Sequence, residues 1–160
     1  MSDRRDVINQ ALNDQVIWAE FDREGRMTDA NDPFLKLFGY RREEAGNLLH
    51  DHLCPAHLRT TEGHMQAWSA VLEGNVQCFE ASRVTKSGRH MSLYSNYSPR
   101  KDASGSCVGI LLWVVDRTEQ VLHAQEDLAK ITALSLTQAV IEFDMQGKVL
   151  DANENFLRLM

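Results

Sequence analysis

The chain has 160 residues, a length that allows one domain and a remnant, and its content of 43% hydrophobic and 25% charged residues is ordinary for a soluble globular chain. Its net charge of −6 argues against a nucleic-acid partner, which would need a basic face. No apolar run is long enough to span a bilayer, no signal peptide is recognisable, and three cysteines without a Cys-x-x-Cys pair favour a reducing cytoplasm, although a longer parent protein can still be membrane-anchored.

The N-terminal part is expected to form a helix, a hairpin and a second helix. The predicted elements are a helix at residues 5–14 within an N-terminal cap at 1–14, strands at 16–21 and 26–28, and a helix at 33–38. Gly25 suits the turn between the strands, because glycine adopts positive φ without strain. Asp29 and Asn31 can cap the second helix, so we assign them no catalytic role.

The middle of the chain combines helices with three strands. Residues 41–63 predict small helices and loops, and residues 62–73 predict a longer helix. One face of that helix carries Met65, Trp68, Val71 and Leu72. The predicted strands are 76–85, 89–97 and 107–116. Two strands, several helices and then three strands indicate an α+β fold with an antiparallel sheet.

Residues 119–135 predict a helical linker. Apolar residues recur there at the a and d spacing of a heptad, among charged neighbours, at Val121, Ala124, Leu128 and Ile131. We expect this helix, together with the N-terminal helix, to pair with its copy in a homodimer.

One segment occurs twice. Ten of the 23 positions from Val16 to Phe38 are identical to those found 122 residues later. Asp29-Ala30-Asn31, for example, returns as Asp151-Ala152-Asn153. The repeated unit has the length of a domain rather than of a solenoid repeat. Residues 136–160 are therefore interpreted as the truncated start of a second domain, and we expect its unburied apolar residues to be disordered or to pack on a second chain.

The ordered motifs resemble those of a PAS domain over about residues 15–118. The motifs are Asp29-Ala30-Asn31, Phe-x-x-x-x-Gly-Tyr from Phe34 to Tyr40, Lys86-Ser87-Gly88, and Asp116-Arg117-Thr118. The resemblance implies a five-stranded antiparallel sheet, helices on one face and a pocket between them. It also implies that Asp116 and Thr118 tie the last strand to the exit helix. Arg117 departs from the family, where an aliphatic residue is commoner.

The tandem arrangement is similar to the sensory part of bacterial methyl-accepting chemotaxis proteins. That resemblance implies a non-enzymatic sensing module of a chemotaxis or aerotaxis receptor, acting on a downstream PAS unit and an output domain. Two alternatives stay open: a cofactor-free PAS module for dimerisation or spacing, and an input domain of a histidine kinase or a diguanylate cyclase.

Trp68 is the first candidate for cofactor binding. In flavin-binding PAS domains of aerotaxis receptors, a tryptophan in the matching place contacts FAD, and an aromatic face can stack on isoalloxazine. The structural alternative is a core tryptophan at helical spacing. Arg83 and Asn96 are further candidates, although the Asn-Arg-Arg-Lys run of some flavin-binding relatives is absent.

His64 is a candidate axial ligand for haem, because haem-binding PAS sensors carry a helical histidine in a comparable place. The alternative is a histidine at the solvent edge of the domain, and a third possibility is that no cofactor binds.

His50, His52, Cys54 and His57 are all of residue types that bind zinc. Their spacing is tighter than in known structural sites, so a polar surface loop without a metal is expected. Cys54 also resembles the flavin-reactive cysteine of LOV-type PAS domains. In those domains the cysteine follows a glycine by three positions, whereas here Leu49 follows Gly46, so no photoadduct is expected.

Overall fold

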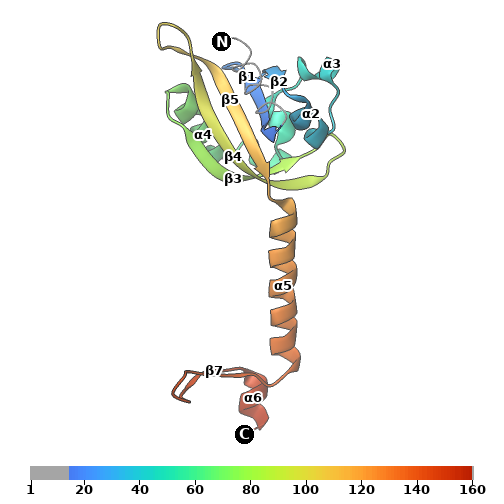
Figure 1. Ribbon diagram of the computed structural model, residues 1–160, viewed down its shortest axis with the longest axis vertical. Coiled ribbons are helices and arrows are strands. Elements are labelled where there is room, and N and C mark those ends of the chain that lie inside the picture. Colours follow the sequence, from blue (N-terminus) through green and yellow to red (C-terminus); the bar gives the residue numbers. More distant parts are fainter. Residues whose placement is uncertain (1–14, 160) are drawn as a thin grey trace, which may run out of the picture. The chain divides into compact units, whose positions relative to one another are not determined.

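The computed structural model describes residues 15–159, so the predicted helix at residues 5–14 lies outside the described part. The chain divides into two compact units that meet between Thr118 and Glu119. The first unit contains, in chain order (Figure 1), β1 (Ile17–Phe21), β2 (Met27–Ala30), α2 (Asp32–Phe38), α3 (Arg42–Ala45), η1 (His50–Leu53), η2 (Ala56–Leu58), α4 (Glu62–Leu72), β3 (Gln77–Val84), β4 (His90–Lys101) and β5 (Cys107–Asp116).

The five strands of this unit form one antiparallel sheet in the order β2-β1-β5-β4-β3. The most apolar strand, β5, lies at its centre, which agrees with its near-continuous run of Val, Ile and Leu. The sheet confirms the predicted α+β PAS fold. Strand β4 is longer than expected, because Ser98 to Lys101 continue its pairing with β5.

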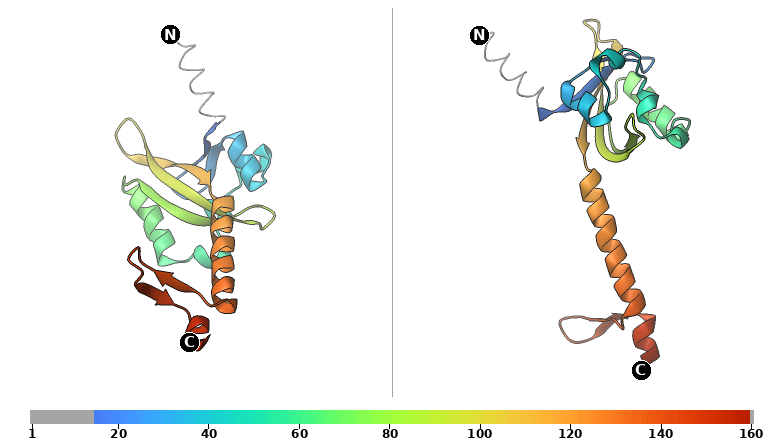
Figure 2. Two further views of the ribbon diagram at one scale, coloured as in Figure 1. Left: turned by 60° about the horizontal axis from the view of Figure 1, so that its bottom comes forward. Right: turned by 90° about the vertical axis from the view of Figure 1, so that its right-hand side faces the viewer.

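Helices cover one face of the sheet (Figure 2). Along β4 every second side chain is buried under them, namely Met91, Leu93, Ser95 and Tyr97. The helices contribute Phe34, Leu35, Phe38 and Val71 to the same core. The alternation assigns odd-numbered residues of β3 and β4 to the helix-covered face and even-numbered residues to the outer face.

The close approach of β1 and β5 requires a glycine at position 109. A Cβ atom at Gly109 would lie 2.4 Å from the backbone oxygen of Phe21, which is too close for any other residue unless the strand moves. Phe21 is fully buried beside this contact. The absence of a side chain at Gly109 therefore lets the first hairpin dock on the centre of the sheet.

The second unit repeats the beginning of the first. It contains helix α5 (Thr118–Thr137), whose first residue closes the first unit, the hairpin β6 (Ile141–Phe143) and β7 (Val149–Ala152), and helix α6 (Glu154–Leu159). The repeated segment is thus folded locally rather than disordered as one alternative had it. Its large apolar side chains stay exposed, among them Phe143, Met145, Leu150 and Leu157. Among the described residues, no helix has the length and apolar character needed to cross a bilayer.

Candidate functional site

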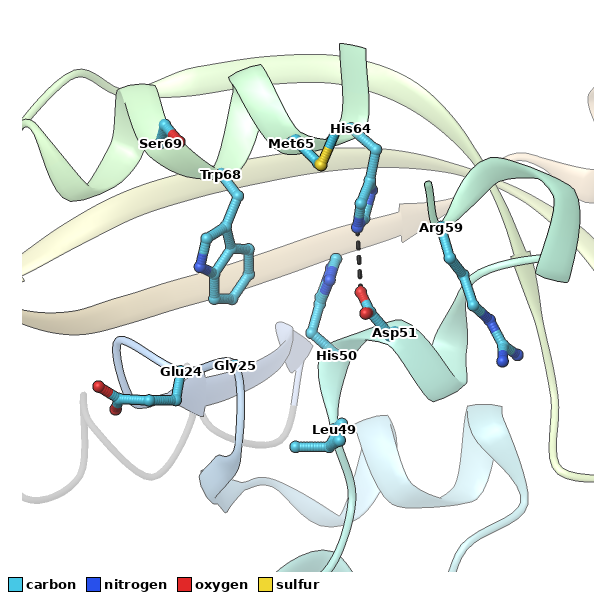
Figure 3. Close-up of a pocket in the computed structure, with 10 residues that line it drawn as sticks. All are labelled: Glu24, Gly25, Leu49, His50, Asp51, Arg59, His64, Met65, Trp68 and Ser69. Atoms are coloured by element: carbon cyan, nitrogen blue, oxygen red, sulfur yellow. Dashed lines mark hydrogen bonds and ion pairs between the residues drawn. The ribbon is translucent and has the colours of Figure 1, made fainter. Parts of the chain in front are cut away.

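A cleft of about 380 Å³ opens between α4 and the segment that enters η1 (Figure 3). Helix α4 contributes His64, Met65, Trp68 and Ser69 to its wall, and the β1–β2 turn closes one end. In Figure 3, Trp68 and His64 point from the helix toward His50. The predicted helix at 62–73 therefore forms a wall of the pocket, but Met65 is 55% exposed and does not belong to the core stripe that its spacing predicts.

The β1–β2 turn holds the other side of the cleft. Gly25 adopts a φ of 83°, and its carbonyl oxygen accepts a hydrogen bond of 2.8 Å from the amide of His50. The indole Nε1 of Trp68 donates to the carbonyl oxygen of Arg23 at 3.2 Å. An ideal Cβ at Gly25 would contact the Trp68 ring at 3.5 Å. The hairpin turn thus positions both His50 and Trp68.

Below the cleft, a chain of polar contacts leads to the sheet. His50 Nε2 and the hydroxyl of Tyr97 on β4 are 2.9 Å apart. Arg83 on β3 donates to the same hydroxyl at 2.5 Å. The ring of Phe79 stacks on Tyr97 with ring centroids 5.4 Å apart. A group bound in the cleft would therefore be connected to two strands through His50 and Tyr97.

The rings around His50 form a compact cluster. The imidazoles of His50 and His64 stack with centroids 5.4 Å apart, and the Trp68 ring lies 4.8 Å from His50. His64 Nε2 lies 3.1 Å from Oδ1 of Asp51 at the mouth of the cleft. The arrangement offers an aromatic surface and two imidazoles to a planar or metal-containing ligand.

Burial governs the charges below the cleft. Burial, helped by the nearby Arg83 and His64, holds the pKa of His50 well below its usual value, so this imidazole is neutral. Burial also raises the pKa of the Tyr97 phenol, and Arg83 opposes that effect. Arg83 is only 4% exposed, and among the described residues no carboxylate forms an ion pair with it. A buried cation of this kind gives the site a positive interior.

Three of the sequence candidates meet here, and one does not. Trp68, His64 and Arg83 all line the cleft or the space directly beneath it. Asn96 lies on the outer face of the sheet, because even-numbered residues of β4 point away from the helices, and its amide nitrogen contacts Cys78 Sγ at 2.8 Å. Asn96 is therefore not part of this site.

The prediction of a polar surface loop at residues 50–57 is wrong for His50, Leu53 and Cys54, which are buried. His50 is 3% exposed, and Leu53 and Cys54 are fully buried. Leu48 and Leu53, which flank His50 and are themselves buried, are the apolar signal that would have indicated an inward-facing turn. The sequence reasoning also missed Tyr97, whose place on the buried face follows from the alternation along β4.

A second polar cluster joins the end of the sheet to α5. Oδ1 of Asp116 accepts hydrogen bonds from the Thr118 amide at 2.9 Å and the Thr118 hydroxyl at 2.5 Å. The amide of Ser92 on β4 donates to that hydroxyl at 3.1 Å, and the Arg117 amide donates back to the Ser92 oxygen at 2.9 Å. Asp116 and Thr118 therefore link β4, β5 and the first residue of α5.

Comparisons with known proteins agree with this architecture. The family model described as the PAS fold matches residues 13–122. The chain is 35% identical over 151 residues to the biofilm dispersion protein BdlA of Pseudomonas aeruginosa. The matched region covers 94% of this chain and 36% of that protein. The chain thus spans about a third of the length of this relative.

Solved structures with the same fold have low sequence identity to the chain. The PAS domain of a protein from Colwellia psychrerythraea superposes with a TM-score of 0.62 at 22% identity, covering 71% of this chain and 97% of that one. A Light-Oxygen-Voltage domain studied with a flavin analogue superposes with a TM-score of 0.58 at 18% identity, covering 76% and 95%. These two likenesses concern the fold.

Proposed function

Because the chain belongs to the PAS fold family, with a PAS sensory domain over most of its length, we propose that it is the sensory module of a bacterial chemotaxis or aerotaxis receptor. The module binds a small ligand or redox cofactor in the cleft beside α4 and transmits its state through the end of β5 into α5. The module has no catalytic role of its own in this proposal.

The observation that carries the proposal is the connection from the cleft to the sheet. His50 lines the cleft on one side, and on the other side its Nε2 contacts the Tyr97 hydroxyl. The same hydroxyl accepts a hydrogen bond from the buried Arg83. A ligand that moves the His50 ring must disturb these contacts, because the neighbouring atoms are closely packed and leave almost no free volume. Binding of a ligand in the cleft would therefore change contacts of strands β3 and β4.

A flavin is the ligand that the aromatic wall supports best. Trp68 and His50 present their rings side by side, and isoalloxazine is a planar aromatic group that stacks on such surfaces. A similar fold occurs in the Light-Oxygen-Voltage domain studied with a flavin analogue. Haem is the second candidate, because His64 lies at the cleft with apolar Met65 and Trp68 beside it.

Signal output is proposed to pass through the cluster of Asp116 and Thr118. Asp116 accepts a hydrogen bond from the Thr118 amide at the start of α5, and the Thr118 hydroxyl accepts one from the amide of Ser92 on β4. Within α5, Leu128 and Ile131 are 65% and 61% exposed, which suits pairing with the same helix of a second chain in the cytoplasm. The hairpin β6–β7 and α6 would open the next PAS unit, which receives the signal before an output domain.

Absorbance of the purified chain tests the sensing step. We expect flavin bands that persist through purification and a flavin that is released on denaturation. Replacing Trp68 by Ala should lower flavin affinity about tenfold, whereas Trp113→Ala on the outer face should leave it unchanged. A Soret band would identify the cofactor as haem instead of flavin. A colourless protein that releases nothing on denaturation would favour the cofactor-free spacer.

Signal transmission is tested in the full-length receptor. Asp116→Ala should abolish or invert the response while ligand affinity stays within about twofold of the wild type, because Asp116 does not line the cleft. Arg117→Ala is the matched control, since its side chain contacts Tyr94 and Glu80 on the outer face. An unchanged response in the Asp116 variant would overturn this route.

A further inference from the structure

We propose that His50, Cys54 and His64 bind one transition-metal ion of the zinc class, with a fourth coordination position open to the cleft. A flavin in the cleft needs no metal ligand, and haem would use His64 alone of these three side chains, so the inference goes beyond the proposed function. Ligand atoms of the three side chains all lie within 4.8 Å of one another.

The separation is close to that of a tetrahedral zinc site. Zn–N bonds of about 2.0–2.1 Å and Zn–S bonds of about 2.3 Å place neighbouring ligand atoms roughly 3.5 Å apart. Side-chain rotations that move each atom by about 1 Å would therefore complete the triangle. His50 and Cys54 come from one turn at η1, whereas His64 comes from α4, so the ion would join two elements across the mouth of the cleft.

His50 supplies the second, independent observation. Its Nε2 contacts the Tyr97 hydroxyl, whereas its Nδ1 is buried and has no hydrogen-bond partner among the described residues. Buried nitrogens without a partner are rare in folded proteins. Nδ1 can become a ligand while Nε2 keeps its proton, because the Tyr97 oxygen has two lone pairs that accept from Nε2 and from Arg83.

The outer contacts of both imidazoles match those of metal-bound histidines. Such histidines hold their second nitrogen against a carboxylate or another polar group, which orients the ring. Asp51 provides that carboxylate at 3.1 Å from His64 Nε2, which leaves Nδ1 of His64 for the ion. The Tyr97 hydroxyl is the corresponding partner of His50 Nε2. The two rings therefore already have the supporting contacts that a metal site needs.

Cys54 completes the set as the only anionic ligand. The buried thiol donates to the His50 carbonyl oxygen at 3.6 Å, and burial raises its pKa while Arg83 and Arg59 favour the thiolate and Asp51 opposes it. Metal binding breaks the S–H bond, forms the metal–sulfur bond and releases one proton to solvent. Three protein ligands leave one position for water or for an anion, as in zinc sites that bind small molecules.

Cobalt and zinc titrations of the untagged, chelator-treated chain test the site. With Cys78 replaced by Ser to remove the exposed thiol, Co²⁺ should bind at one equivalent and produce a thiolate-to-cobalt charge-transfer band that Zn²⁺ abolishes. Cys54→Ser should remove the band, and His64→Ala should weaken binding by more than about 100-fold. Asp51→Asn should weaken it by about tenfold, because only the orientation of His64 is lost.

His52→Ala is the matched control, because this exposed histidine lies in the same turn but outside the triad. It should bind cobalt as the wild type does. Circular dichroism checks that each variant is folded, and His64→Ala serves if Cys54→Ser is unfolded, since its side chain is partly exposed. Absence of the band in the wild type, its persistence in Cys54→Ser, or an equal loss in His52→Ala would overturn the proposal. Flavin content is measured separately, so failure of the metal proposal and failure of the proposed function can be told apart.

Discussion

The hairpin β1–β2 and the hairpin β6–β7 have the same register and the same bulge, although 122 residues separate them in the chain. In the first, Asn31 Oδ1 accepts the amide of Phe34 at 3.1 Å. In the second, Asn153 Oδ1 accepts the amide of Phe156 at 3.0 Å. The turn glycines Gly25 and Gly147 share a φ of 83°. The strand register, the bulge, the helix cap and the turn are therefore the same in both copies.

The surroundings of the two hairpins differ completely. Phe21 is fully buried, whereas Phe143 at the equivalent position is 55% exposed. Leu35 is 4% exposed, and its counterpart Leu157 is 64% exposed. The cause is the neighbouring strand: β1 pairs with β5 on its second edge, and among the described residues β6 pairs with β7 alone. A hairpin motif thus specifies its own hydrogen bonds, but its burial depends on the rest of the domain.

The largest test of this contrast removes the buried ring in each copy. Phe21→Ala should lower the free energy of unfolding by about 3–5 kcal/mol, because it leaves a cavity in the core. Phe143→Ala should lower it by less than about 0.5 kcal/mol. Urea unfolding followed by tryptophan fluorescence measures the effect of each substitution on the first unit, which contains all three tryptophans. A similar loss in both variants would mean that Phe143 is buried in solution, for example between two chains.

The next test removes the helix caps. Asn31→Ala should cost about 1–2 kcal/mol of unfolding free energy, since it deletes a buried cap that also joins β1 to the start of α2. Asn153→Ala should leave the tryptophan-detected transition unchanged and accelerate hydrogen exchange at the amide of Phe156. Equal protection of that amide in the variant and the wild type would show that the second cap contributes nothing.

A third test uses pH, because the first hairpin is covered by His50 and the second has no such cover among the described residues. Burial, with Arg83 and His64 nearby, lowers the pKa of His50 in the folded state, so below about pH 6.5 the unfolded chain binds a proton that the native chain does not. Stability should therefore fall as the pH drops, by at most about 1.4 kcal/mol per unit. His50→Gln should flatten this slope, and the exposed His90→Gln should keep it; an unchanged slope in the first variant would contradict the assignment.

The smallest expected effect concerns one acidic position in each copy. Asp32 pairs with Arg42, whose guanidinium also donates to the Ala30 oxygen at 3.0 Å. The equivalent Glu154 pairs with Arg158 one turn along α6. Arg42→Ala should cost up to about 1 kcal/mol, and Arg158→Ala no more than about 0.5 kcal/mol of helix stability. Raising the salt concentration in denaturation and helicity measurements should shrink both effects, and salt-independent values would exclude an electrostatic origin.

Some of the site was accessible from sequence because it depends on local pattern. The apolar spacing of residues 62–73 predicted α4, and the resemblance to PAS domains implied that this helix, with His64 and Trp68, forms a wall of a pocket. The Asp-x-Thr motif identified Asp116 and Thr118, whose hydrogen bonds with each other span only two positions. Asn96 was assigned to the site against the alternation along β4, which places Tyr97 on the buried face with Met91 and Leu93 and Asn96 on the outer face.

The sequence by itself determined the α+β order of elements, the two hairpins, their caps and turns, because these follow from interactions between residues that are close in the chain. Only the tertiary structure decided which polar residues meet. His50 was expected at the surface, and Cys54 and His64 are ten residues apart, yet packing of η1 beneath α4 buries the first two and brings all three together. Burial and long-range contacts depend on surfaces contributed by distant segments, and so they separate the first copy of the repeat, with its pocket, from the second.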